Sequence, residues 1–145
     1  MSKGAAFRWE YGEQLAREWA VAHDNEIERA AIVGSVLRKA EECHDVDILV
    51  IPKTGMTIIE ADPPINIFIT TRDAWEPALM QYAPSVGSTI GTRARAKEAG
   101  YKLNQYGLFQ KEQLVSLSAR RIVQIINATL SQWVDKSLNG KGFLK

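Results

Sequence analysis

The chain has 145 residues, about the size of one ordinary domain. Hydrophobic residues make up 46% of it, and no stretch approaches the ~20 uncharged apolar residues that a membrane-spanning helix needs. The N-terminus lacks the basic-then-apolar order of a signal peptide, and a single cysteine, Cys43, excludes an internal disulfide. We therefore expect an intracellular protein that has no membrane partner. We also expect the chain to act as a monomer.

The net charge of +1 conceals a division along the chain. Residues 1–92 carry eight Lys or Arg against fourteen Asp or Glu, whereas residues 93–145 carry ten against three. An acidic region suits bound cations, and a basic region suits a polyanion such as a nucleic acid. Chance clustering of surface charge is the alternative, and charge alone gives the two readings equal weight.

The first half of the chain predicts a helix followed by strands. Apolar spacing indicates an amphipathic helix over residues 10–22, and "AAIVGS" indicates a buried strand that ends in a turn. Ser35 is placed to cap a short helix that runs to about Glu41. "DVDILVIP", "MTIIEA" and "INIFIT" predict three further strands, separated by turn residues. Because side chains alternate along a strand, Asp45 and Asp47 share one face of theirs, and Asn66 shares a face with Phe68.

The second half predicts helices and one hairpin. "TRDAWEPALMQYA" indicates a helix that Asp73 could cap, and "TIGTRARAKEAGYKL" indicates a basic helix that ends at Gly100. "LNQYGLF" and "EQLVSL" predict a hairpin around residues 110–111. The spacing of apolar residues predicts one long amphipathic helix over 118–138, and residues 139–145 are expected to form a flexible tail.

One constellation of residues carries chemistry. Gly34 and Ser35 join a strand to a helix, where backbone N–H groups can face an anion. Arg38 follows one turn later and can reach the same phosphate. Asp45 and Asp47 then stand on one face of the next strand, where carboxylates suit magnesium that bridges the protein and triphosphate oxygens. A solvated strand entrance is the alternative reading of the two aspartates.

The ordered motif "GSVLRKAEECHDVD" resembles the signature of the nucleotidyltransferase superfamily, which is Gly-Ser, a spacer and Asp-x-Asp on a strand. The later segment "RARAKEAGYKLNQYGLF" is similar to the thumb of family X DNA polymerases, the polymerase beta-like enzymes. The resemblance covers about residues 30–117 and lacks the family's N-terminal lyase domain. It implies a minimal palm and thumb, similar to the compact viral members.

The resemblance implies an α+β fold with a small mixed or antiparallel sheet that has helices on one face. This palm would span residues 1–72, a mostly helical thumb-like subdomain would span 73–138, and 139–145 would be the tail. In the family, the Gly-Ser turn and the following arginine bind the triphosphate, which implies nucleotide binding by Gly34, Ser35 and Arg38. The two aspartates of the motif hold two magnesium ions, for which manganese can substitute.

The third metal-ligating aspartate of the family falls on Asn66 when residues are counted back from "KLNQYGLF". An amide oxygen can ligate a metal, but it carries no charge and cannot accept a proton. The resemblance therefore implies that Asp45, Asp47 and Asn66 are the catalytic and metal-binding residues. Binding of the catalytic metal ion would be weakened by the uncharged Asn66. Asp62 and Asp73 flank this strand and are the possible substitutes.

The thumb residues complete the implied site. Tyr82 stands in the family's aromatic position near the nucleotide, although Pro84 replaces its flexible glycine, and Thr89 stands where the family contacts the nascent base pair. Contacts with DNA are implied for four basic residues, for which a solvated helix face is the alternative: Arg93, Arg95, Lys97 and Lys102.

The resemblance therefore implies a DNA polymerase that adds nucleotides to a DNA 3′ end and fills short gaps, with a nucleoside triphosphate and a primer-template or gapped duplex as partners. Two alternatives remain at this point. One is a non-catalytic homologue that binds nucleotide and DNA, which Asn66 favours. The other is a nucleotidyltransferase that acts on RNA, a protein or a small molecule.

Overall fold

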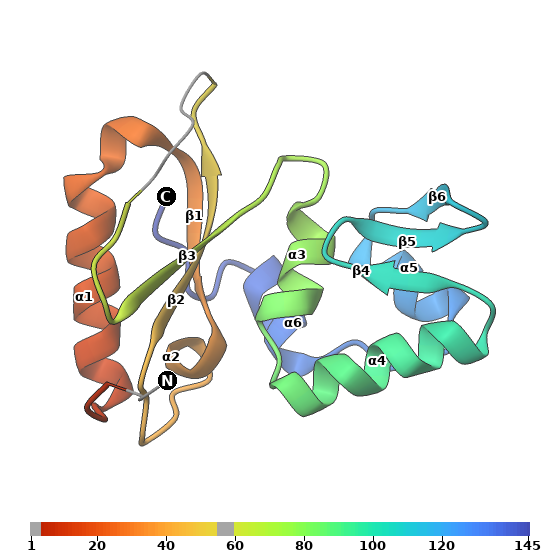
Figure 1. Ribbon diagram of the computed structural model, residues 1–145, viewed down its shortest axis with the longest axis horizontal. Helices are drawn as coiled ribbons and strands as arrows, with labels where there is room; N and C mark the ends of the chain where they lie inside the picture. The colour runs from red at the N-terminus through yellow and green to blue at the C-terminus, as the bar shows by residue number, and fades with distance from the viewer. Residues whose placement is uncertain (1–3, 55–59) are drawn as a thin grey trace.

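The computed structural model describes residues 4–54 and 60–145, and it contains two three-stranded sheets joined by helices (Figure 1). None of the helices in these ranges is long and apolar enough to cross a membrane. The elements are, in chain order, α1 (Trp9–Ala22), η1 (Asp24–Glu26), β1 (Ile27–Val33), α2 (Gly34–Leu37), β2 (Val46–Pro52), β3 (Ile65–Ile69), α3 (Trp75–Tyr82), α4 (Val86–Glu98), β4 (Lys102–Asn104), β5 (Gly107–Gln110), β6 (Gln113–Ser116), α5 (Ala119–Ile125) and α6 (Gln132–Leu138).

The first sheet is mixed, in the order β1-β2-β3, which confirms the expected α+β class. β1 runs antiparallel to β2 and β2 runs parallel to β3. Val33, at the end of β1, lies opposite Asp47, and Asp47 lies opposite Asn66. The end of one strand and the beginnings of two others therefore meet at one edge of the sheet.

Helices approach this sheet from both faces. A Cβ atom added to Gly12 in α1 would come within 3.4 Å of the Val46 side chain, so α1 covers the face that carries Val46. The Arg29 guanidinium lies 4.3 Å from the centre of the Trp75 ring of α3, and Arg29 pairs with Ile51 on the other face. That second face also carries Asp47, because side chains alternate along β2.

The second sheet is antiparallel in the order β4-β5-β6, and it contains the expected hairpin. Lys111 and Glu112 form its turn, with φ angles of 50° and 66°. Leu103 and Leu108 are buried, so the face of the sheet that carries them packs against the core. Helix α4 lies beside β4, and its Ser85 cap accepts a hydrogen bond from the Ser88 N–H group.

Two expected helix starts differ from the structure. The helix after Gly34 has a single turn that ends at Leu37, and Ser35 is its second residue rather than its cap. A cap at Asp73 is also wrong, because α3 starts after Ala74, whose N–H group donates to the Thr71 hydroxyl. Both segments are too short to settle their boundaries by pattern, so tertiary packing decides them.

The expected long helix over 118–138 is two helices, α5 and α6. The chain breaks at Asn127, which has a φ of 54°, and the Ala128 N–H group donates to the Val123 carbonyl. This break lets both helices pack against α3 (Figure 1). The strand expected over "MTIIEA" falls mostly on residues 55–59, outside the described ranges, and Glu60 and Ala61 are not in a strand.

The C-terminal segment, residues 139–145, is a docked segment rather than the expected flexible tail. The Ile32 N–H group donates to the Gly142 carbonyl at 2.7 Å, and the Leu144 N–H group donates to Ala30 at 2.9 Å. The Lys145 ammonium lies 3.0 Å from Asp24. The segment therefore covers the edge of β1 that β2 leaves open, which removes an exposed strand edge.

Gly142→Ala is expected to lower the free energy of unfolding by about 1–3 kcal/mol, because the new Cβ atom would meet the Ile32 carbonyl oxygen at 2.7 Å. Gly140→Ala is the matched control. Gly140 also has a positive φ, yet a Cβ atom there would meet nothing within 4 Å. Urea unfolding of the two variants measures the difference, and equal losses would contradict the docked arrangement.

Candidate active site

The turn after β1 lies directly against Asp47. Gly34 has a φ of 70°, and a Cβ atom there would lie 2.5 Å from Asp47 Oδ2. Only glycine tolerates both the backbone conformation and this approach. Helix α2 has four residues, so what it could offer an anion is the N–H groups of its first turn rather than a long helix dipole. Ser35 lies beside this turn and is half-buried.

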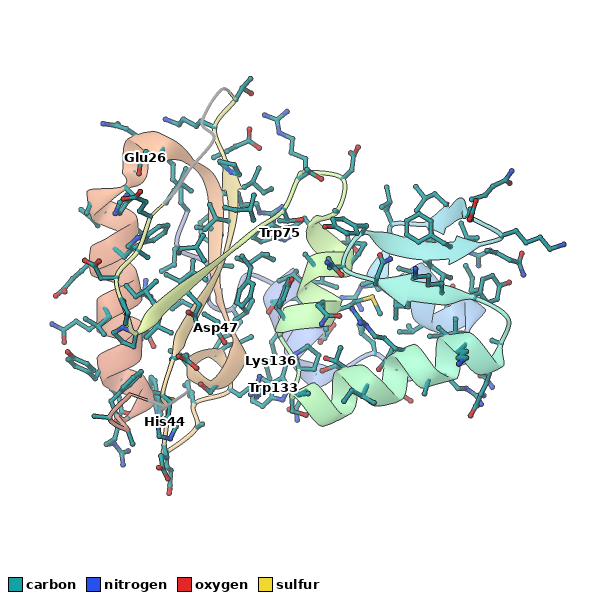
Figure 2. All side chains as sticks on the ribbon, viewed as in Figure 1. Glu26, His44, Asp47, Trp75, Trp133 and Lys136 are labelled. Carbon is teal, nitrogen blue, oxygen red and sulfur yellow. The ribbon has the colours of Figure 1, made fainter. Side chains whose placement is uncertain are left out.

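Asn66 lies beside Asp47, on the next strand. Its Nδ2 atom donates to Asp47 Oδ1 at 3.2 Å, which follows from the parallel register of β2 and β3. Asp47 lies on the side of β2 that faces α3 and α6 (Figure 2). The structure thus brings together Gly34, Asp47 and Asn66, three of the residues singled out in the sequence.

Burial gives the Asp47 carboxyl an unusual electrostatic environment. Desolvation raises its pKa, the hydrogen bond from Asn66 lowers it, and the charge of the nearby Asp45 raises it again. Asp45 is exposed, one residue before β2. The positive charge of Arg38 also lowers this pKa, but burial is the largest effect, and a partly desolvated carboxylate is a good ligand for a cation.

Arg38 connects this edge of the sheet to the helices. It ends α2, and its Nη1 atom donates to the Ala83 carbonyl at the end of α3, at 3.0 Å. Burial lowers the pKa of Arg38, and the negative charge of Asp47 partly opposes that effect. One N–H group of the guanidinium is therefore occupied by the backbone, and the other N–H groups could donate to an anion.

Tyr82 is held near Asp47 and Asn66 by Phe68, a residue whose role the sequence did not indicate. Its ring stacks on Phe68, with centroids 4.3 Å apart and planes 21° apart. Phe68 is two residues from Asn66 on the same face of β3. Burial raises the pKa of the Tyr82 hydroxyl, Tyr106 adds to this effect and Arg93 opposes it. The spacing of residues carries no signal for this contact, since it joins two distant elements.

Gln81 is a second residue that sequence reasoning missed. Its side-chain oxygen accepts a hydrogen bond from Arg93, and its backbone carbonyl accepts one from the Thr89 hydroxyl. Thr89 is 7% exposed and its hydroxyl is used in this bond, so the structure does not bring it to Asp47. Arg93 is half-buried and held against α3 by an uncharged partner, and it forms no ion pair among the described residues.

The other basic residues differ in what they contact. Arg95 donates to the Asn127 carbonyl and lies 3.4 Å from Glu98, so it joins α4 to the end of α5. Lys97 and Lys102 are exposed. The predicted DNA-binding set therefore contains two exposed lysines and two arginines that also hold the fold together.

The donor atoms at this edge fit one divalent cation. Asp45 and Asp47 offer the oxygen ligands that magnesium prefers, and a cation would relieve the desolvated charge of Asp47. Asn66 turns its amide nitrogen toward Asp47, and in the described ranges no three His, Cys, Asp or Glu side chains gather around one point. A third carboxylate, which a second ion would require, is therefore missing from this group.

The sequence matches no family model and no curated protein. The fold is similar to that of Leishmania infantum polymerase beta, solved as a crystal structure of a ternary P/T complex. The TM-score is 0.66 at 13% identity, and the match covers 90% of this chain and 76% of that chain. The chain therefore has a polymerase beta-like fold.

Proposed function

We propose that this chain is a nucleotidyltransferase that adds nucleotides to a DNA 3′ end, most simply to fill short gaps. The contact of Gly34 with Asp47, with Asp45 and Asn66 beside them, carries this proposal. Residues 1–72 would act as the palm and 73–138 as the thumb. The polymerase beta-like fold supports the assignment.

The proposed roles follow from the position of each side chain. The backbone N–H groups at Gly34 and Ser35 would bind the triphosphate, and Arg38 would add a charged donor from its free nitrogens. Tyr82 would lie against the sugar. The 3′-hydroxyl oxygen would form a bond to the α-phosphorus, and the bond from that phosphorus to the bridging oxygen would break, which releases pyrophosphate.

Asp45 and Asp47 would hold magnesium, or manganese in its place, with Asn66 standing where a second ion would need a carboxylate. The ion, when bound, supplies positive charge that neutralises the triphosphate. The proton of the 3′-hydroxyl needs a base, and the Asn66 amide cannot accept it. We therefore expect slow transfer by the unaltered chain, about 10²–10⁴-fold below a chain with a carboxylate at this place.

Duplex DNA would lie along the thumb, where four basic residues would contact its phosphates: Arg93, Arg95, Lys97 and Lys102. Such contacts release counterions, so binding should weaken steeply as salt rises.

A second candidate is a homologue that binds nucleotide and DNA without catalysis. The observation in its favour is the Asn66 amide, which donates to Asp47 at 3.2 Å and leaves the site without a base. An acceptor other than DNA, such as RNA, a protein or a small molecule, is disfavoured by the basic second half of the chain.

Primer extension on one-nucleotide-gapped DNA tests the proposal. We expect slow, magnesium-dependent extension that falls as salt rises, together with tighter binding of a nucleoside triphosphate when magnesium is present. Magnesium-dependent nucleotide binding with no product, even after long incubation, would favour the non-catalytic candidate. Nucleotide binding without any affinity for gapped DNA at moderate salt would instead point to another acceptor.

A further inference from the structure

A pocket on the second sheet lies outside the group of residues around Asp47. It has a volume of about 370 Å³ and lies where the end of α4 meets the turn between β5 and β6. Its walls include two aromatic rings, Tyr101 and Phe109, and the polar side chains of Lys102, Asn104 and Lys111. A volume near the lower end of the range for ligand pockets suits a small planar group.

Phe109 is not part of the hydrophobic core among the described residues, so core packing does not explain its position. Leu108, its neighbour in β5, is fully buried, so Phe109 points to the opposite face of the sheet. In the described part of the chain, Tyr101 packs against the hydrophobic core but Phe109 does not. Leu114, opposite Phe109 on β6, is 50% exposed and extends the same apolar surface. An aromatic ring held half-buried at the pocket wall is available for stacking.

The charges around the pocket favour a polyanion. Lys102 is the cross-strand partner of Phe109, and Lys111 stands at the turn. Among the described residues, neither lysine forms an ion pair. Glu112 is the only carboxylate among the described residues that line the pocket, which leaves an excess of positive charge. Lys97, on the last turn of α4, belongs with Lys102 to the DNA-binding residues proposed above, so the basic surface at the pocket continues into that set.

Asn104 offers hydrogen-bond donors in a fixed position at the pocket. Its carboxamide oxygen accepts the Tyr106 N–H group at 2.8 Å, which fixes the side chain. Its NH₂ group makes no hydrogen bond within the described ranges, so two donors remain for the acceptor atoms of a ligand. A stacking ring, flanking cations and an unused amide form the combination that binds an unpaired base of a nucleic acid strand.

We infer that this pocket holds an unpaired nucleobase from the single-stranded extension of a DNA substrate, stacked on Phe109 and hydrogen-bonded by Asn104. Lys102 and Lys111 bind the flanking phosphates. The inference rests on the proposed function, because it assumes that DNA is bound along α4. It adds a second contact with DNA, one that reads the presence of a base rather than the duplex backbone.

Affinity for three matched DNAs tests this inference. The DNAs are a blunt duplex, the same duplex with a short single-stranded extension, and the same duplex with an extension of abasic sites. The unaltered chain is expected to prefer the extension with bases by about tenfold over the abasic one, since stacking of one base contributes about that much. A 2-aminopurine in the extension should lose fluorescence on binding.

Phe109→Ala is expected to remove the preference for bases while affinity for the blunt duplex stays unchanged, and Phe109→Trp should keep it. Phe143→Ala, at an exposed phenylalanine of the C-terminal segment beside β1, is the control. Equal affinity for the two extensions, or an equal loss on all three DNAs, would overturn the inference and leave this apolar face to a protein partner. No affinity for any of the three DNAs would refute the proposed function as well.

Discussion

Asn66→Asp is expected to raise the rate of magnesium-dependent primer extension by about 10²–10⁴-fold over the unaltered chain. The side chain already lies within 3.2 Å of Asp47 Oδ1, on a neighbouring strand whose register places the two residues opposite each other. The substitution changes one NH₂ group to an oxygen and leaves the size of the side chain unchanged. The gain therefore requires no movement of the backbone.

The same substitution should make the metal-free protein less stable. The hydrogen bond from Asn66 to Asp47 would be replaced by repulsion between two carboxylates, and Asp45 already raises the pKa of Asp47. Magnesium would relieve this repulsion. We therefore expect a lower melting temperature in EDTA, and a larger increase on adding magnesium than the unaltered chain gives.

Asn25→Asp is the matched control for Asn66→Asp. Asn25 is exposed and lies just before β1, whose first residue pairs with Pro52 at the opposite end of the sheet from Asp47. This variant gains the same charge and should gain no activity. If Asn66→Asp extends the primer no faster than the unaltered chain, Asn66 is not the missing ligand, and Asp62 becomes the next candidate.

Sequence patterns predicted the strand and turn arrangement because it depends on local rules. Two apolar runs separated by a polar connection predicted β1 and β2, and alternation predicted the faces of Asp47 and Asn66. Their contact could not be predicted, because it requires β3 to pair with β2 in one particular register. Alternation along each strand says nothing about which strands are neighbours.

Helix boundaries were predicted less well, because packing decides them. Apolar residues keep a helical spacing through 118–138, yet the chain breaks at Asn127 so that Ile122 and Val134 enter one core from two directions. Residues 139–145 contain two glycines and little apolar surface, which is typical of a flexible end. They dock because β1 has an open edge, and no feature within the segment itself indicates that edge.

The contacts that join the first sheet and α2 to α3 were the least predictable part of the candidate site. Arg38 was expected to serve only the triphosphate, but it also binds the Ala83 carbonyl across 45 residues of sequence. Phe68 was noted only for its face of the strand, but it stacks on Tyr82. Arg38 and Phe68 thus also fix the position of α3 relative to the first sheet.

Asp47→Asn is expected to weaken magnesium-dependent nucleotide binding by at least about 100-fold, because a ligand charge that is worth several kcal/mol is lost. The same variant should be more stable than the unaltered chain in EDTA at pH 7. Burial raises the pKa of Asp47 above its value in the unfolded chain, so the ionised carboxylate destabilises the folded state. The hydrogen bond from Asn66 can persist, since the new side chain keeps an acceptor oxygen.

The pH dependence separates this effect from a general change in packing. As the pH falls through the raised pKa and then below the unfolded value, Asp47 becomes neutral in both states, so the advantage of Asp47→Asn should vanish. Asp73→Asn is the control, because this exposed carboxyl follows the end of β3 that lies away from Asn66 and is therefore not a substitute ligand beside Asp47. It should change neither nucleotide binding nor stability at pH 7. A stability gain that persists at acid pH would mean that amide packing, rather than removal of a desolvated charge, causes it. If magnesium-dependent nucleotide binding is unchanged by Asp47→Asn, Asp47 is not a metal ligand and the proposed active site is wrong.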